Sequence, residues 1–135
     1  MRLRLRLRGT QPYTNRYYDI QEFYRNASLE KEHNLADEVF RLTISLPRSE
    51  DYGLTSQIRK SSNGAAACIA EGFGRGTKKD KSNFYIIARG SSYETQNHLL
   101  YGKKVEYFET QKTKKLFDEY NGLIHELNKL IKSLE

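Results

Sequence analysis

A glycine-rich basic stretch contains the residues of this sequence best suited to chemistry, and that chemistry is anion binding. Residues 72–79 read Gly-Phe-Gly-Arg-Gly-Thr-Lys-Lys. Their spacing is not that of a P-loop, and they follow an expected helix rather than a strand, which excludes a dinucleotide-binding turn. A helix beginning after Gly76 would still present unpaired backbone N–H groups beside several cations, and such a helix end attracts phosphate. The alternative is an interhelical turn with a solvated basic rim.

The candidate site for RNA, DNA or another anion combines the cations of this stretch with two from the preceding segment. Its members are Arg75, Lys78, Lys79, Lys81, Arg59 and Lys60. Further basic pairs at 103–104 and 114–115 are interpreted as solvated faces. The tyrosines near them, including Tyr101 and Tyr107, suit either stacking on bases or a subunit interface.

Residues that could ligate a metal or act as a nucleophile do not have the complete spacing of a metal or catalytic site. Glu30 and His33 have the Glu-x-x-His spacing of di-iron bundles, but no second such pair follows. Glu94 and His98 are one helical turn apart and suit either a metal pair or a polar contact. The lone Cys68 excludes an internal disulfide framework and lies among small residues, which favours a core position. We therefore expect a non-enzymatic protein with no catalytic residue, metal or cofactor.

The positive charge of the chain is concentrated at its start. The 135 residues include 23 Lys and Arg against 17 Asp and Glu, a formal charge of +6. Five arginines and no acid fall within residues 1–16, so the remainder holds 18 basic and 17 acidic residues. A nucleic-acid function of the folded part must therefore rest on a local cluster of cations rather than on overall charge.

Residues 1–19 are expected to be a basic, disordered N-terminal extension, and residues 20–135 a single folded domain. Arg and Leu alternate over residues 2–8 as in a β-strand, but nothing in the sequence offers this strand a partner. Alternative readings of the extension are a nucleic-acid arm and a membrane-surface contact. The chain has no apolar run long enough to span a membrane, and we expect a cytoplasmic protein with no membrane partner.

Four segments with helical periodicity account for the domain. Ser28 is the expected N-cap of the first helix and Pro47 its stop, while Thr77 and Asp80 have the spacing of a capping box at the start of the third. Short turns between the segments predict an all-α, antiparallel up-down four-helix bundle. The expected helices are 28–46, 54–71, 77–104 and 110–134.

The last of these helices has the widest apolar face. A second row of Phe117, Ile124 and Ile131 lies beside a first row spaced four and three residues apart, which consists of Leu116, Tyr120, Leu123, Leu127, Leu130 and Leu134. Such a face suits a helix that contacts two neighbours in the bundle, or one neighbour and another subunit.

Several strings in this chain resemble the 23S rRNA intervening-sequence proteins, also described as four-helix bundle proteins. They are residues 52–60, 69–75, 78–79, 84–85 and 87–91. The resemblance covers residues 20–135 and implies a bacterial, ribosome-related bundle that assembles as a homopentamer and has no established activity. The resemblance also implies a structural role for the motif residues, in which the acids pair with arginines at a helix or subunit boundary. These residues are Glu71, Gly72, Gly74, Arg89 and Glu94.

The function predicted from these observations is binding of RNA or DNA by a non-enzymatic oligomeric bundle, through basic loop and helix-end residues. The alternative is a scaffold that contacts other proteins and has no nucleic-acid role.

Overall fold

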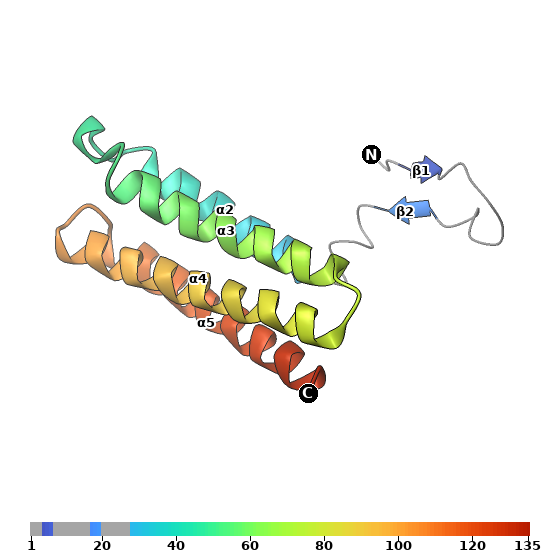
Figure 1. Cartoon of the computed structure of the whole chain (residues 1–135). Helices are drawn as coiled ribbons and strands as arrows, with labels where there is room; N and C mark the ends of the chain where they lie inside the picture. Colours follow the sequence, from blue (N-terminus) through green and yellow to red (C-terminus); the bar gives the residue numbers. More distant parts are fainter. Residues whose placement is uncertain (1–3, 7–16, 20–27) are drawn as a thin grey trace.

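The computed structural model describes residues 4–6, 17–19 and 28–135 of the chain. Within the last range, helices α2 (Leu29–Thr43), α3 (Leu54–Gly74), α4 (Lys78–Lys104) and α5 (Thr110–Ser133) run alternately up and down (Figure 1). A short 3-10 helix, η1 (Arg48–Glu50), connects α2 to α3. The predicted all-α, antiparallel four-helix bundle is therefore confirmed.

Two short strands precede the bundle. β1 (Arg4–Arg6) pairs antiparallel with β2 (Tyr17–Asp19), with Leu5 opposite Tyr18. The expectation that β1 has no partner was wrong, because a second strand lies within the same extension, where the adjacent Tyr17 and Tyr18 favour strand. The disorder predicted for the extension concerns mainly residues 1–3 and 7–16, which lie outside the described residues.

The helix ends differ from the predicted ones for local reasons. α2 gives way after Thr43 to tighter turns, in which Ile44 N–H donates to the carbonyl of Arg41 and Leu46 N–H to that of Thr43. Ser28 does not cap α2 through its side chain; its backbone is left-handed, with φ of 53°. α3 continues beyond residue 71 to Gly74, because its last carbonyls find a side-chain donor that is described below.

The start of α3 is capped from a distance. Gly53, the residue before the helix, has no side chain, and the Glu50 carboxylate accepts the N–H of Leu54 instead, at 2.9 Å. A Cβ on Gly53 would lie 2.8 Å from Oε2 of Glu50, so glycine leaves room for this cap.

Replacing Thr77 with Ala should lower the free energy of unfolding by about 1 kcal/mol. The Thr77 hydroxyl accepts the N–H of Asp80 at 3.1 Å, as the capping-box spacing predicts, and alanine would leave this helix-end donor to water. Urea denaturation followed by circular dichroism measures the loss. The Thr77→Ser variant keeps the acceptor and should match the original protein; equal losses in both variants would contradict the capping role.

The core lies along the bundle axis and takes its widest contribution from α5. Leu123 and Leu127 of the first apolar row are fully buried, and Ile124 and Ile131 of the second row are 5% and 8% exposed. The two rows thus pack mainly inside this chain. The reading of α5 as a helix that contacts two neighbours is the one the structure favours, since α5 packs on both α4 and α2.

Close approaches between elements are made possible by two glycines. A Cβ on Gly72 of α3 would lie 2.7 Å from the Tyr85 ring of α4. A Cβ on Gly102 would overlap the ring of Phe108, which folds back under α4 from the following turn. None of the helices in the described ranges is both long and apolar enough to cross a membrane.

Candidate nucleic-acid interface and a buried polar layer

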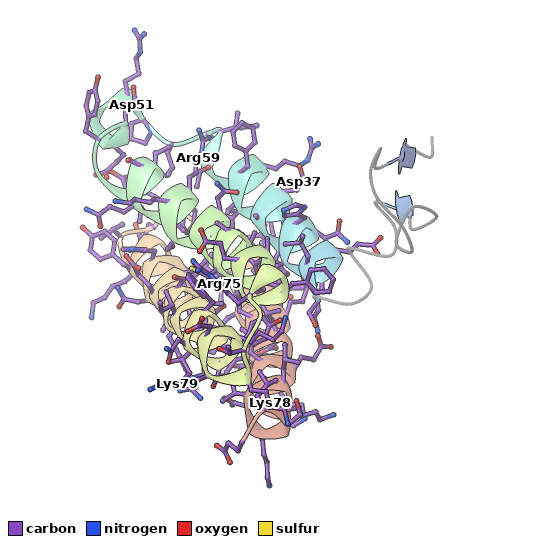
Figure 2. The ribbon with its side chains drawn as sticks, turned by 45° about the vertical axis from the view of Figure 1, so that its right-hand side comes forward. Asp37, Asp51, Arg59, Arg75, Lys78 and Lys79 are labelled. Carbon is purple, nitrogen blue, oxygen red and sulfur yellow. The ribbon has the colours of Figure 1, made fainter. Side chains whose placement is uncertain are left out.

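The turn between α3 and α4 leaves two cations free. Lys78 and Lys79 are exposed in the first turn of α4, and neither has an ion pair or hydrogen bond within the described part of the chain. Asp80 is the acid in that turn. Figure 2 shows both lysines at the end of the bundle opposite Asp51. They combine positive charge with the free N–H groups of a helix N-terminus, which is the arrangement that attracts phosphate.

The other two cations of the turn have partners inside the protein. The Arg75 guanidinium lies 3.3 Å from Oε2 of Glu71 and stacks 4.6 Å from the centre of the Phe84 ring. Lys81 donates to the carbonyls of Phe73 at 2.7 Å and Gly72 at 3.3 Å, and so caps the C-terminus of α3. Lys81 thus has a structural role, while Arg75 keeps an exposed but partly neutralised charge.

Arg59 and Lys60 lie elsewhere on the molecule. Arg59 precedes Arg75 by sixteen residues of continuous helix, or about 24 Å along the axis. Its guanidinium lies 4.2 Å over the ring of Phe40, and its Nε donates to Oγ1 of Thr43 at 2.8 Å. The structure therefore does not bring these two cations to the α3–α4 turn, and it uses Arg59 to join α2 to α3.

The motif residues inferred from the family resemblance make structural contacts. The expected pairing of Glu71 with an arginine is present, with Arg75 as the partner. Arg89 instead donates to Oδ1 of Asn128 at 2.8 Å and links α4 to α5. Glu94 lies 3.4 Å from His98, which is the polar contact foreseen as the alternative to a metal pair. Gly74 has open space where a Cβ would stand.

Metal-ligating side chains do not gather into a cluster among the described residues. No group of three or more His, Cys, Asp and Glu in that part of the chain has the arrangement of a metal site. Cys68 is half-buried against the core, and burial, with a smaller effect of the Glu71 charge, raises the pKa of its thiol. A raised thiol pKa opposes reactivity, because the thiolate is the nucleophile.

A polar layer inside the core takes one side chain from each helix and was not anticipated. Glu32 of α2, Ser61 of α3, Thr95 of α4 and Tyr120 of α5 are all buried. The Ser61 and Thr95 hydroxyls are hydrogen-bonded at 2.8 Å. Both carboxyl oxygens of Glu32 lack a hydrogen-bond partner within the described residues, while the Tyr120 hydroxyl lies near that of Thr95. Glu32 falls on the helical stripe between Leu29 and Leu35, a signal that could have revealed a buried acid.

Burial determines the protonation of this layer. Loss of solvation raises the pKa of Glu32 to about 9, so its carboxyl group is neutral at pH 7. Burial, and then the nearby Glu32 charge, raise the pKa of Tyr120 above its ordinary value. The layer is therefore uncharged under ordinary conditions, which is what a dry bundle core requires.

Two glutamates, Glu38 of α2 and Glu119 of α5, lie close to each other where these helices meet. Burial raises the pKa of Glu38, and a hydrogen bond to Glu119, together with the negative charge of Glu119, adds to the rise. Two carboxylates that share a hydrogen bond hold one proton between them more tightly than either would alone.

The fold and the surface define an antiparallel helical bundle with basic residues at one end and a polar layer in its core. The sequence model of the family described as "23S rRNA-intervening sequence protein" matches residues 25–129. The chain therefore belongs to the 23S rRNA-intervening sequence protein family. Membership confirms the resemblance drawn from the motifs at 52–60 and 69–75.

A crystal structure shares this fold. It is that of a protein with unknown function from the S23 ribosomal protein family of Bacteroides thetaiotaomicron. The TM-score is 0.64 at 20% sequence identity, and the match covers 78% of this chain and 95% of the other. A comparison with curated proteins finds no match. The likeness at this level of identity concerns the fold.

Proposed function

We propose that this protein is a non-enzymatic, oligomeric bundle that binds RNA or DNA through phosphate contacts at the start of α4. The observation that carries the proposal is the pair Lys78 and Lys79, which are exposed and unpaired at a helix N-terminus. Arg75, the first residue after α3, adds a third cation to this turn, and Glu71 partly offsets its charge. Repetition of this small cluster by symmetry would build the larger basic surface that tight binding of nucleic acid requires.

The test compares Lys78→Ala/Lys79→Ala with a matched control, Lys114→Ala/Lys115→Ala. The control removes two adjacent exposed lysines whose charges are already offset by Asp118 at 2.7 Å and Glu119 at 4.0 Å. Fluorescence anisotropy with single-stranded RNA over a salt series should show a shallower fall of log K with log salt for the first variant. Each lost phosphate contact changes the slope by about 0.7. Equal slopes in the two variants would remove the α4 lysines from the proposed site.

The oligomer in this proposal would form through the outer face of α4. Ile86, Tyr93 and Leu100 follow one another at intervals of seven residues, the repeat of a helix-packing seam. They are 41%, 54% and 48% exposed, although each is large and apolar or aromatic. This stripe also favours the second candidate function, a scaffold that contacts proteins, because interfaces are enriched in such side chains. A homopentamer, which the family resemblance implies, would cover Ile86 and Tyr93, in the first two-thirds of α4, with a second copy of the chain.

The Ile86→Glu/Tyr93→Glu variant should therefore be monomeric at concentrations where the original protein is an oligomer. Charges at the centre of an interface must be desolvated, whereas at an exposed position they cost little stability. Light scattering coupled to size exclusion gives the mass, and a thermal melt confirms that the variant is folded. An unchanged oligomer would place the interface elsewhere, and a monomeric original protein would contradict self-association altogether.

A further inference from the structure

A hollow lies between α3 and α4, near the end of the bundle that carries η1, and neither the candidate site nor the core uses it. Its volume is about 390 Å³, and its lining includes Glu50, Gln57, Asn97, His98 and Tyr101. We call it the Tyr101 hollow. Two helices and the turn before α3 supply these residues, so the hollow is part of the packed bundle rather than of a single loop.

Two of its walls are held in place by contacts within the protein. The Glu50 carboxylate accepts the N–H of Leu54 at 2.9 Å and the Tyr107 hydroxyl at 3.4 Å. His98 is only 9% exposed, and its Nε2 lies 3.4 Å from a carboxylate oxygen of Glu94. The Glu50 carboxylate makes the inside of the hollow unsuitable for an anion, so a guest must be neutral or positively charged where it enters.

The remaining polar groups of the hollow are free. The side-chain amides of Gln57 and Asn97 are exposed on facing helices and make no hydrogen bond within the described residues. Each amide offers one acceptor and two donors, a set that matches the edge of a nucleobase and of adenine above all. The Tyr101 ring is 50% exposed one turn beyond Asn97, where it offers an aromatic face for stacking.

Cations flank the hollow without entering it. Lys60 follows Gln57 by three residues on α3, and Lys104 follows Tyr101 by three residues on α4, so each lies on the same helix face as the group it follows. Both are exposed and have no ion pair within the described ranges. Positive charge outside a neutral, amide-lined hollow suits a chain whose phosphates stay in solvent while one base is inserted.

We propose that the Tyr101 hollow binds an unpaired base of a single-stranded nucleic acid. The base stacks on Tyr101 and pairs through its edge with the amides of Gln57 and Asn97, while Lys60 and Lys104 contact the neighbouring phosphates. This inference rests on the proposed function and adds to it a site of base recognition. The α4 lysines 78 and 79 lie at the other end of the bundle, so the two sites are separable by mutation.

The test measures the affinity of the full-length chain for oligo-A, oligo-C and oligo-U RNA of equal length over a salt series. The original protein should prefer oligo-A. The Gln57→Ala/Asn97→Ala variant should lose about tenfold in affinity for oligo-A, and its preference with it, while the salt slope stays unchanged. The control Asn63→Ala/Gln111→Ala removes two exposed amides outside the hollow and should change nothing. Equal affinities of the original protein for all three RNAs would overturn the inference.

Variants of Tyr101 separate stacking from a structural role of the ring. Tyr101→Phe keeps the aromatic face and should bind oligo-A like the original protein, whereas Tyr101→Ala should lose about tenfold. Thermal melts check that both remain folded. Equal binding by both variants would contradict stacking in the hollow.

Free nucleosides distinguish failure of this inference from failure of the proposed function. Adenosine should shift the side-chain amide NMR signals of Gln57 and Asn97 in isotope-labelled protein, and uridine should shift them less. If RNA binds with a normal salt slope but neither the variants nor adenosine has an effect, the base site is wrong and the phosphate site stands. If adenosine shifts these signals but no RNA binds at low salt, the proposed function is wrong, and the hollow binds a free nucleoside rather than a base of a nucleic acid.

Discussion

The Glu32→Gln variant should be more stable than the original protein at pH 7, by about 3 kcal/mol, and should lose most of the pH dependence of its unfolding. Burial raises the pKa of Glu32 from 4.5 to about 9, so the folded chain holds a proton that the unfolded chain releases. Each pH unit above the unfolded pKa then costs the fold about 1.4 kcal/mol. Glutamine keeps the shape of the neutral carboxyl group but has no proton to lose.

The sign of this effect is fixed by the direction of the shift. Because the folded pKa is raised, the Glu32 contribution is complete below pH 4.5 and declines as pH rises toward 9. Urea denaturation at about pH 5, 7 and 8.5 should therefore show that the unfolding free energies of Glu32→Gln and the original protein diverge as pH rises. The exposed Glu30 on the same helix gives a matched control, since Glu30→Gln should follow the original protein. Parallel curves for Glu32→Gln and the original protein would contradict a neutral buried acid.

The Gly102→Ala variant should lose about 3 kcal/mol of unfolding free energy. The added Cβ would overlap the Phe108 ring, which is 4% exposed and held beneath α4 where the turn to α5 begins. The ring belongs to the core, so it has little freedom to move aside. The Gly102→Ala/Phe108→Leu double variant should recover part of the loss, because leucine is smaller and flexible.

Gly64→Ala gives the control for Gly102→Ala. Apart from the adjoining backbone of α3 itself, no atom lies within 4 Å of the position of a Cβ on Gly64. Alanine there should stabilise the protein by about 0.5 to 1 kcal/mol, since glycine is a poor helix former. Thermal or urea unfolding of both variants measures the contrast. A loss in Gly64→Ala equal to that in Gly102→Ala would mean that any change of glycine disturbs these helices, and the packing explanation would fail.

The helices themselves were predictable because apolar periodicity and turn residues are local signals. All four were placed, and the α4 start followed from the Thr77 cap, which the structure contains. The predicted end of α3 at residue 71 falls three residues short of the observed end at Gly74. The reason is that Lys81, seven positions beyond Gly74, supplies the donor for the last carbonyls of the helix. β1 was left unpaired because its partner at 17–19 is separated from it by ten residues that give no hairpin signal.

The candidate site was predictable only as a list of charges. The sequence locates Arg75 and Lys81 beside Lys78 and Lys79 but does not show that the first two are engaged by Glu71 and by the α3 carbonyls. Partners of this kind depend on side-chain directions at a turn, which periodicity does not describe. The same limit applies to the core, where Tyr120 was predicted as an apolar residue and lies instead in a polar layer.

Glu32 shows why the polar layer escaped prediction. Acidic residues are almost never fully buried, so a glutamate between Leu29 and Leu35 is assigned to the surface by default. Its burial follows from the position of α2 on the bundle, which brings it toward Tyr120 of α5, 88 positions away along the chain. The layer is a property of the four helices together.

The measurement that tests the proposed function most directly is the salt dependence of RNA binding by a chain that lacks residues 1–16. Removing these residues takes away five arginines and leaves the bundle and its α4 lysines intact. If the folded body binds phosphate, the shortened chain still binds single-stranded RNA at low salt, and log K falls steeply and linearly with log salt. Loss of all binding at low salt in the shortened chain would contradict a nucleic-acid interface on the bundle.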